Sequence, residues 1–276
     1  MRHILSTHLF VDQRLTAALL DRILRSGISE IELFCARQHL DYRNSNQIQE
    51  LGHWFRDSEL TVHSVHSPMF SDDVWGRTGP QSTISLTETS KAKRITATDE
   101  IKRALEVAEV IPYRYLVQHL GVLYEEYSEA KADAAFNSLD ELSIFARQRG
   151  VQILLENTPN EFSTAERLNY FVESTHLPLF FCFDTGHANI ARGVALEYET
   201  MKNRIRSTHV HDNDGKADGH LFPLGGNGGT IDWKSTMDLL RSGNSDTPLL
   251  LELMPVAEMA SPLDEVKKCF ELLEKL

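Results

Sequence analysis

Cysteine is scarce in this chain, and its three copies are widely separated. They are Cys35, Cys182 and Cys269, and none of them belongs to a CxxC pair. The sequence therefore favours neither a disulfide framework nor a zinc site built from thiolates. Few cysteines without a pattern are typical of a protein in a reducing compartment, so we expect a cytoplasmic location.

Long hydrophobic runs are also missing. No stretch of about 18 consecutive apolar residues is present, so we expect no transmembrane helix and no membrane partner. The first ten residues, MRHILSTHLF, lack the apolar core and cleavage site of a secretory signal. No linker or low-complexity segment divides the 276 residues, of which 41% are hydrophobic. Such a chain can bury a sizeable core, and we expect one domain over residues 1–276.

Basic residues are outnumbered, because 28 Lys and Arg against 40 Asp and Glu give a formal net charge of −12. An acidic chain gains no general attraction to polyanions, which argues against nucleic acid as a partner. The segment KAKRITATDEIKR at 91–103 holds five basic residues. Their helical spacing favours a solvated helix face over a surface that binds a nucleic-acid backbone.

Short apolar runs alternate with segments whose apolar residues have helical spacing, from one end of the chain to the other. The runs cover residues 3–10, 28–34, 60–67, 114–120, 151–157, 179–184, 205–211 and 249–254. Eight β–α units in a chain of this length predict the α/β class and a single (β/α)8 TIM barrel. A doubly wound sheet is the alternative, but no dinucleotide-binding fingerprint is present.

A polar side chain stands at or near the end of every predicted strand. These residues are His8, Glu32, His66, His119, Glu156, Asp184, His209 and Glu252. The active site of a (β/α)8 barrel lies at the carboxyl ends of its strands. Glu156, Asp184 and Glu252 sit in apolar runs, and a buried carboxylate must be paired or must bind a metal. The pattern therefore predicts a divalent-metal site, although a lone histidine at a strand end is more often structural.

Residues 207–233 concentrate further polar groups in one stretch. His209 and His211 are two residues apart, so on an extended chain their side chains share a face. A loop with several more acidic and imidazole groups follows, namely Asp212, Asp214, Asp218 and His220. Imidazole and carboxylate are the usual ligands of a catalytic divalent metal. Taken alone, this stretch also fits a polar surface loop with two chance histidines.

A second long connection, residues 71–98, is polar and contains the segment WGRTGPQ. A long loop inside a compact domain is often a lid or a binding loop, so we predict lid roles for Trp75 and Arg77. The alternative for Trp75 is an exposed aromatic ring that packs on its own loop. The later part of this connection has a helical pattern.

Seven short motifs stand at or after these predicted strand ends, in a specific order along the chain. They are HSP (66–68), QHLG (118–121), ENTP (156–159), FDTGHAN (183–189), HVHDNDGKADGH (209–220), PLGGNGGTIDW (223–233) and LELM (251–254). With them the chain resembles the xylose-isomerase-like TIM-barrel superfamily, which holds sugar isomerases and epimerases together with zinc AP endonucleases. The resemblance covers essentially the whole chain, and it is more specific for the superfamily than for one activity.

The resemblance to the isomerases and epimerases implies one divalent metal held by Glu156, Asp184, His209 and Glu252, with His187 grouped among the ligands. The metal would be Mn²⁺, Zn²⁺, Co²⁺ or Mg²⁺. It would chelate a carbohydrate substrate, while Glu156 and Glu252 move protons through an enediolate. Further residues would bind the substrate, namely His66, His119, His211, Asp218 and His220. Barrels of this kind often form homo-oligomers, and nothing in the sequence selects a contact surface.

The resemblance to the AP endonucleases implies a different function, a zinc phosphodiesterase with two or three metals. Its additional ligand positions are His66, His119, His187, Asp218 and His220, and all carry suitable side chains. The acidic net charge argues against this alternative, so we favour the sugar enzyme. The turn LGGNGG (224–229) departs from the Gly-Glu-Gly that both groups often show, so no role of that Glu is carried over. A non-catalytic sugar-binding barrel is a third hypothesis, disfavoured by the intact pair Glu156 and Glu252.

Overall fold

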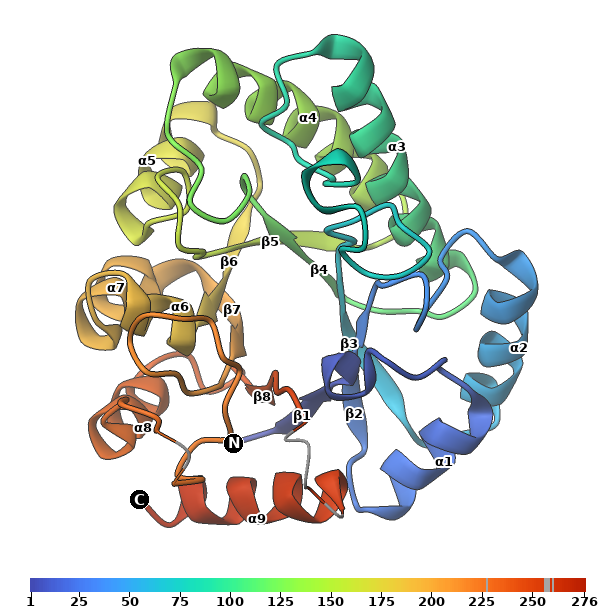
Figure 1. Ribbon diagram of the computed structural model, residues 1–276, viewed down its shortest axis with the longest axis vertical. Coiled ribbons are helices and arrows are strands. Elements are labelled where there is room, and N and C mark those ends of the chain that lie inside the picture. Colours follow the sequence, from blue (N-terminus) through green and yellow to red (C-terminus); the bar gives the residue numbers. More distant parts are fainter. Residues whose placement is uncertain (227, 256–258, 260) are drawn as a thin grey trace.

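Eight parallel strands form a nearly closed barrel in the computed structural model, which describes residues 1–226, 228–255, 259 and 261–276 (Figure 1). The strands are β1 (His3–Ser6), β2 (Glu30–Phe34), β3 (Thr61–His66), β4 (Tyr115–His119), β5 (Gln152–Glu156), β6 (Phe180–Asp184), β7 (Ile205–His209) and β8 (Leu249–Leu251). Their order in the sheet is β7-β6-β5-β4-β3-β2-β1-β8. The predicted (β/α)8 barrel is therefore confirmed.

The two edges of the sheet, β7 and β8, meet just beyond the end of β7. The backbone N–H of Val210 donates to the carbonyl of Leu250 at 2.8 Å, and the N–H of Glu252 donates to the carbonyl of Val210 at 3.3 Å. These bonds leave little of either edge unpaired, which is how a barrel removes the exposed strand edges of an open sheet.

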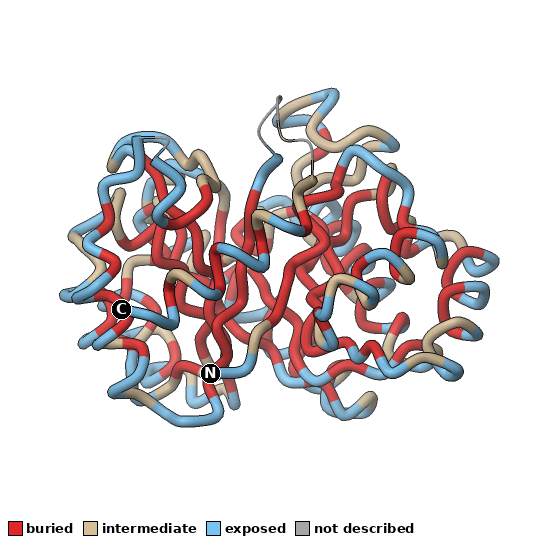
Figure 2. The backbone as a smooth tube through the Cα atoms, turned by 90° about the horizontal axis from the view of Figure 1, so that it is seen from below, coloured by how far each residue is buried: buried red, intermediate tan, exposed pale blue. Residues whose placement is uncertain are grey.

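Helices surround the strands and present one apolar side to them. They are α1 (Ala17–Arg25), α2 (Ser45–Arg56), α3 (Lys91–Glu106), α4 (Glu129–Arg147), α5 (Ala165–Thr175), α6 (Thr185–Ile190), α7 (Val194–Met201), α8 (Trp233–Ser242) and α9 (Pro262–Glu274). Short 3-10 turns lie at η1 (Thr7–Phe10), η2 (Gly79–Gln81), η3 (Val107–Glu109) and η4 (Lys202–Arg204). Figure 2 shows the buried strands in the middle of the molecule and exposed residues on the outer sides of the helices. No described helix is long and apolar enough to cross a membrane.

The ends of the first and last predicted strands differ from the expectation. The apolar run 3–10 is a strand only as far as Ser6, because the Ser6 hydroxyl accepts from the N–H of His8 at 3.4 Å and the chain turns into η1. The run 249–254 is a strand only as far as Leu251, and Glu252 follows the strand. The later part of the 71–98 connection is α3, as its pattern predicted.

Candidate metal centre

Three carboxylates and one imidazole meet at the carboxyl ends of the strands. Glu156 ends β5, Asp184 ends β6, His209 ends β7, and Glu252 follows β8. The parallel register sets Asp184 beside His209, so the side chains emerge at one rim of the barrel. One donor atom from each of the four lies within 4.8 Å of the others. All four are almost completely buried, with exposed fractions of 0% to 2%.

His209 stands at the centre of this group. Its Nδ1 lies 3.2 Å from Oε2 of Glu156 and 3.2 Å from Oε2 of Glu252. The same nitrogen is 3.9 Å from Oδ2 of Asp184. The opposite ring nitrogen, Nε2, lies 3.2 Å from Oε2 of Glu32. One nitrogen of the ring therefore faces the three acids, and the other faces Glu32 on the opposite side of the ring.

The donor set suits a divalent cation. Among the described residues, neither oxygen of Glu156 nor Nδ1 of His209 has a hydrogen bond of acceptable geometry. Buried polar atoms are seldom left in this state, and carboxylates packed this closely repel one another. Oxygen and imidazole donors bind Mn²⁺, Co²⁺, Mg²⁺ and Zn²⁺, so the residues fit the predicted metal without selecting one.

The acids and imidazoles of the centre shift one another's pKa strongly. Burial alone would raise the pKa of Glu156, but His209 and His119 outweigh it and hold this pKa well below its ordinary value. Burial alone would lower the pKa of His209, but Cys182, Glu252, Glu32 and Glu156 outweigh it and raise this pKa well above its ordinary value. A ring with a raised pKa carries a proton, and a metal must displace that proton to bind.

A second cluster lies beside the first and extends toward the loop after β7. It consists of His187, His211, Asp218 and His220, whose donor atoms lie within 4.8 Å of one another. Oδ2 of Asp218 is 3.0 Å from Nε2 of His187 and 3.3 Å from Nε2 of His220. Burial would lower the pKa of His220, but Asp218 raises it to about 9. His211 joins the two clusters, because its Nε2 lies 3.0 Å from Oδ2 of Asp184.

Two more predicted residues approach Glu156 from β3 and β4. Nε2 of His66 lies 3.6 Å from Oε2 of Glu156, and Nε2 of His119 lies 3.3 Å from the same oxygen. Nδ1 of His187 faces the other oxygen of Glu156 at 3.1 Å. The structure therefore brings together all ten residues that the sequence offered as metal or substrate ligands, and their individual roles stay predictions.

Comparison with known proteins places this architecture in a family. A family model described as "Xylose isomerase-like TIM barrel" matches residues 20–276. The chain belongs to this family. The resemblance drawn from the strand-end motifs is thereby confirmed. The xylose isomerase-like chain is 27% identical to an uncharacterized protein of Methanocaldococcus jannaschii, in an alignment that covers 100% of this chain and 91% of the relative.

Solved structures share the barrel of this xylose isomerase-like protein. A D-tagatose 3-epimerase-like protein is 24% identical with a TM-score of 0.76, covering 100% of this chain and 96% of the other. The 3-keto-D-glucoside 4-epimerase of E. coli is 16% identical with a TM-score of 0.77, covering 100% of both chains. The IOLI protein, solved with a zinc atom, is 18% identical with a TM-score of 0.75, covering 99% and 98%. At these identities the likeness establishes the fold.

The two predicted lid residues lie differently. Trp75 packs at the mouth of the barrel, with ring centroids 5.6 Å from His8 and 5.5 Å from Phe34. It also contacts Phe70 of its own loop, at 6.1 Å. Arg77 is exposed, and no ion pair links it to the described site residues. The placement of Trp75 suits a lid, and the lid role of Arg77 stays a prediction.

Sequence reasoning gave no role to two residues that contact the centre. Glu32 was recognised only as a strand-end acid, yet it lies behind His209. Cys182 has its sulfur within 4.8 Å of donor atoms of Glu156 and His209. The signal for Cys182 was the two-residue period of a strand, which places it on the same side as Asp184. The predicted glycine-rich turn falls partly outside the described residues, because Asn227 is not among them.

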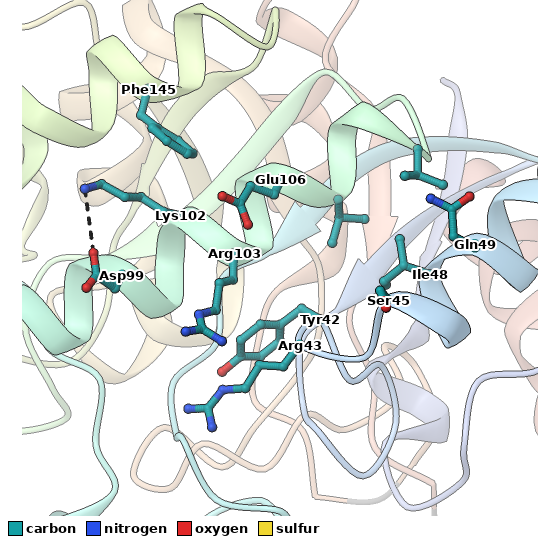
Figure 3. Close-up of a pocket in the computed structure, with 12 residues that line it drawn as sticks. Tyr42, Arg43, Ser45, Ile48, Gln49, Asp99, Lys102, Arg103, Glu106 and Phe145 are labelled. Atoms are coloured by element: carbon teal, nitrogen blue, oxygen red, sulfur yellow. Dashed lines mark ion pairs between the residues drawn. The ribbon is translucent and has the colours of Figure 1, made fainter.

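A cavity of about 480 Å³ lies away from this centre, between α2 and α3 (Figure 3). Two of its cationic lining residues have acidic partners, since Arg43 binds Glu100 at 2.7 Å and Lys102 lies 3.7 Å from Asp99. None of the strand-end acids or histidines lines it. This cavity therefore contains none of the candidate site residues.

Proposed function

We propose that this protein is a divalent-metal-dependent sugar isomerase or epimerase that moves a proton next to the carbonyl of a carbohydrate. The observation that supports it most is the buried set Glu156, Asp184, His209 and Glu252, with donor atoms within 4.8 Å of one another. Such a set suits a single cation, which would supply Lewis-acid polarisation of a carbonyl oxygen when bound. The family supports the same class, because its solved relatives include sugar epimerases.

Glu156 and Glu252 are the acid/base pair in this proposal. They come from β5 and from the segment after β8, and each places an oxygen 3.2 Å from Nδ1 of His209. One of the two, as a carboxylate, removes the proton α to the carbonyl, and the other, as the protonated acid, returns a proton to the resulting enediolate. The return goes to the opposite face for an epimerase or to the neighbouring carbon for an isomerase. Positioned acid/base groups contribute roughly 10²- to 10⁴-fold to rate.

The surrounding residues would bind and cover the sugar. His66, His119 and His220 stand around the centre with ring nitrogens that can bond hydroxyl groups. The ring of Trp75 at the mouth would exclude water from the reacting carbon. A carbohydrate suits this mixture of polar side chains and an aromatic ring, because sugars present both hydroxyl groups and C–H faces.

The proposal is tested by metal content and proton exchange in the same preparation. We expect about one divalent metal per chain by mass spectrometry, and metal-dependent uptake of solvent deuterium into a ketose or aldose. Glu156→Gln should reduce this exchange by roughly 10²-fold or more. Glu100→Gln, at a carboxylate that binds Arg43 and Tyr42 far from the centre, is the matched control. Equal exchange by wild type and Glu156→Gln would refute the acid/base assignment.

A phosphodiesterase with several metals is the second candidate, and one observation favours it. Two of the donor clusters in the described residues share Glu156, namely His66, His119 and Glu156, and Glu156, Asp184, His209 and Glu252. A further cluster, His187, His211, Asp218 and His220, shares no ligand with them but lies beside them, because Nε2 of His211 is 3.0 Å from Oδ2 of Asp184. Clusters that share ligands can hold metals close enough to clamp one phosphate. Two or three zinc ions per chain, with cleavage of a phosphodiester and no sugar exchange, would replace the isomerase proposal.

A further inference from the structure

Glu32 is a carboxylate that no role proposed so far explains. It lies on β2 with an exposed fraction of 0%, and β2 and β7 occupy different sides of the barrel (Figure 1). Burying an ionised carboxylate is costly unless a specific partner compensates for it. The partner here is His209, whose Nε2 lies 3.2 Å from Oε2 of Glu32.

A second hydrogen bond fixes the carboxylate that faces His209. Ser64 on β3 is the direct strand neighbour of Glu32, and its hydroxyl donates to Oε2 at 2.8 Å. The same oxygen therefore accepts from Ser64 and from the ring of His209. Both contacts come from strands, which hold their side chains more rigidly than loops do.

The position of Glu32 has a direct consequence for His209. When Nε2–H donates to Glu32, the lone pair of a neutral ring must lie on Nδ1. That nitrogen faces Oε2 of Glu156 and Oε2 of Glu252, each at 3.2 Å. Without Glu32 the ring could rotate, and a buried Nε2–H would have no acceptor.

We propose that Glu32 is a positioning residue that orients His209 so that Nδ1 points at the metal position. Its contact is with the imidazole, on the side away from Glu156 and Glu252. Carboxylates behind a ligating histidine fix the ring and raise its basicity, and their loss typically weakens metal binding roughly 10- to 100-fold. This inference rests on the proposed metal function.

The test compares Glu32→Leu and Glu32→Gln with wild type by chelator competition for Co²⁺ and Zn²⁺. We expect Glu32→Leu to weaken binding roughly 10- to 100-fold and to change the visible absorption of bound Co²⁺. Glu32→Gln keeps an oxygen that accepts from Nε2–H, so it should restore most of the affinity and the wild-type spectrum. If Glu32 served folding alone, both variants would keep the wild-type Co²⁺ spectrum and would bind Co²⁺ with equal affinity.

Glu197→Leu is the matched control for removing a buried carboxylate. Glu197 lies on α7 with an exposed fraction of 0%, accepting from the N–H of Ala165 at 2.8 Å and from Arg192 at 2.8 Å. We expect this variant to lose stability and keep wild-type metal affinity. If Glu32→Leu binds Co²⁺ with wild-type affinity and spectrum, the positioning role is wrong.

Crystal structures without metal separate this inference from the proposed function. If wild type binds no divalent metal, the proposed function fails, but the orientation of His209 can still be compared between wild type and Glu32→Leu. A rotated or disordered His209 ring in the variant would support Glu32 as its positioning residue. An unchanged ring would overturn that role.

Discussion

Gly186 determines how closely His211 can approach the metal centre. A Cβ at this position would lie 2.0 Å from Cε1 of His211, far inside van der Waals contact. We therefore expect Gly186→Ala to displace the His211 ring and break its 3.0 Å contact with Oδ2 of Asp184. Metal affinity should fall by roughly tenfold or more, as for other residues that orient ligands, and chelator competition measures it.

The control for Gly186→Ala is Gly52→Ala on α2. A Cβ on Gly52 would lie 2.4 Å from Cγ1 of Val110, so the two substitutions create similar crowding. Gly52 is far from the centre, and its variant should unfold more easily while keeping wild-type metal affinity. Loss of affinity in both variants would mean that general destabilisation, and not the His211 contact, causes the effect.

Single residues of the centre could be predicted where chemistry restricts them strongly. Glu156, Asp184 and Glu252 were recognisable because an acid in an apolar run demands a partner. The role of Glu32 was not predictable, although the same rule applies to it. Its function depends on which nitrogen of His209 it faces, and that is set by packing across the barrel. The close contact of Gly186 with His211 likewise exists only in three dimensions.

The loop between β7 and α8 is clamped by one carboxylate, Asp212. Oδ2 of Asp212 accepts from Nε1 of Trp233 at 2.6 Å. Oδ1 accepts three backbone N–H groups, from Asn213 at 2.8 Å, Thr230 at 3.0 Å and Ile231 at 3.2 Å. These bonds close the base of the loop that carries Asp218 and His220. These bonds hold the loop so that it presents both residues to the centre.

We expect Asp212→Asn to loosen this loop. An amide has one acceptor oxygen in place of two. Its NH₂ group would therefore face another donor, either the Trp233 ring N–H or the backbone N–H groups. The penalty for such a buried mismatch is about 1–3 kcal/mol. Hydrogen exchange should become faster in residues 213–226, measured by mass spectrometry. Asp214→Asn is the control, because Asp214 accepts from Lys216 and Ala217 at the exposed tip of the loop.

Elements were predicted well where their period was clear and poorly where a turn intervened. The runs that became β2 to β7 were each placed within two residues of the observed strands. The first run was overextended because Leu9 and Phe10 continue its apolar character, whereas the Ser6 hydroxyl starts a turn there. The clamp at Asp212 was not predictable, because its partners lie 18 or more residues further along the chain for three of the four bonds.

Metal binding should stabilise the whole molecule, because the centre joins four different strand ends. A ligand that binds only the folded chain at 100 times its dissociation constant adds about 2.7 kcal/mol to the free energy of unfolding. We expect EDTA to lower the midpoint of thermal unfolding, and added Mn²⁺, Co²⁺ or Zn²⁺ to restore it. Asp184→Asn should respond weakly to both treatments. An equal response in this variant would place the bound metal elsewhere.

Stability at low pH provides a test of the core outside the centre, at His39. This imidazole has an exposed fraction of 0%, and its Nδ1–H donates to the carbonyl of Gln13 at 2.5 Å. Burial lowers its pKa from 6.5 to about 4, although backbone hydrogen bonds partly oppose the shift. Between these values the unfolded chain binds a proton that the folded chain does not, so this contribution to stability is lost as the pH falls from 6.5 to 4.

His39→Asn isolates that contribution, because the amide can keep the donor to Gln13 and cannot titrate. In EDTA, urea unfolding should show wild type losing about 3 kcal/mol relative to this variant between pH 7 and pH 4. Gln47→Leu is the control, since Gln47 donates to the carbonyl of His39 without carrying a charge. Its deficit relative to wild type should be the same at both pH values. If the difference in the free energy of unfolding between wild type and His39→Asn does not change with pH, His39 has the same pKa in the folded and unfolded chains and the prediction is wrong.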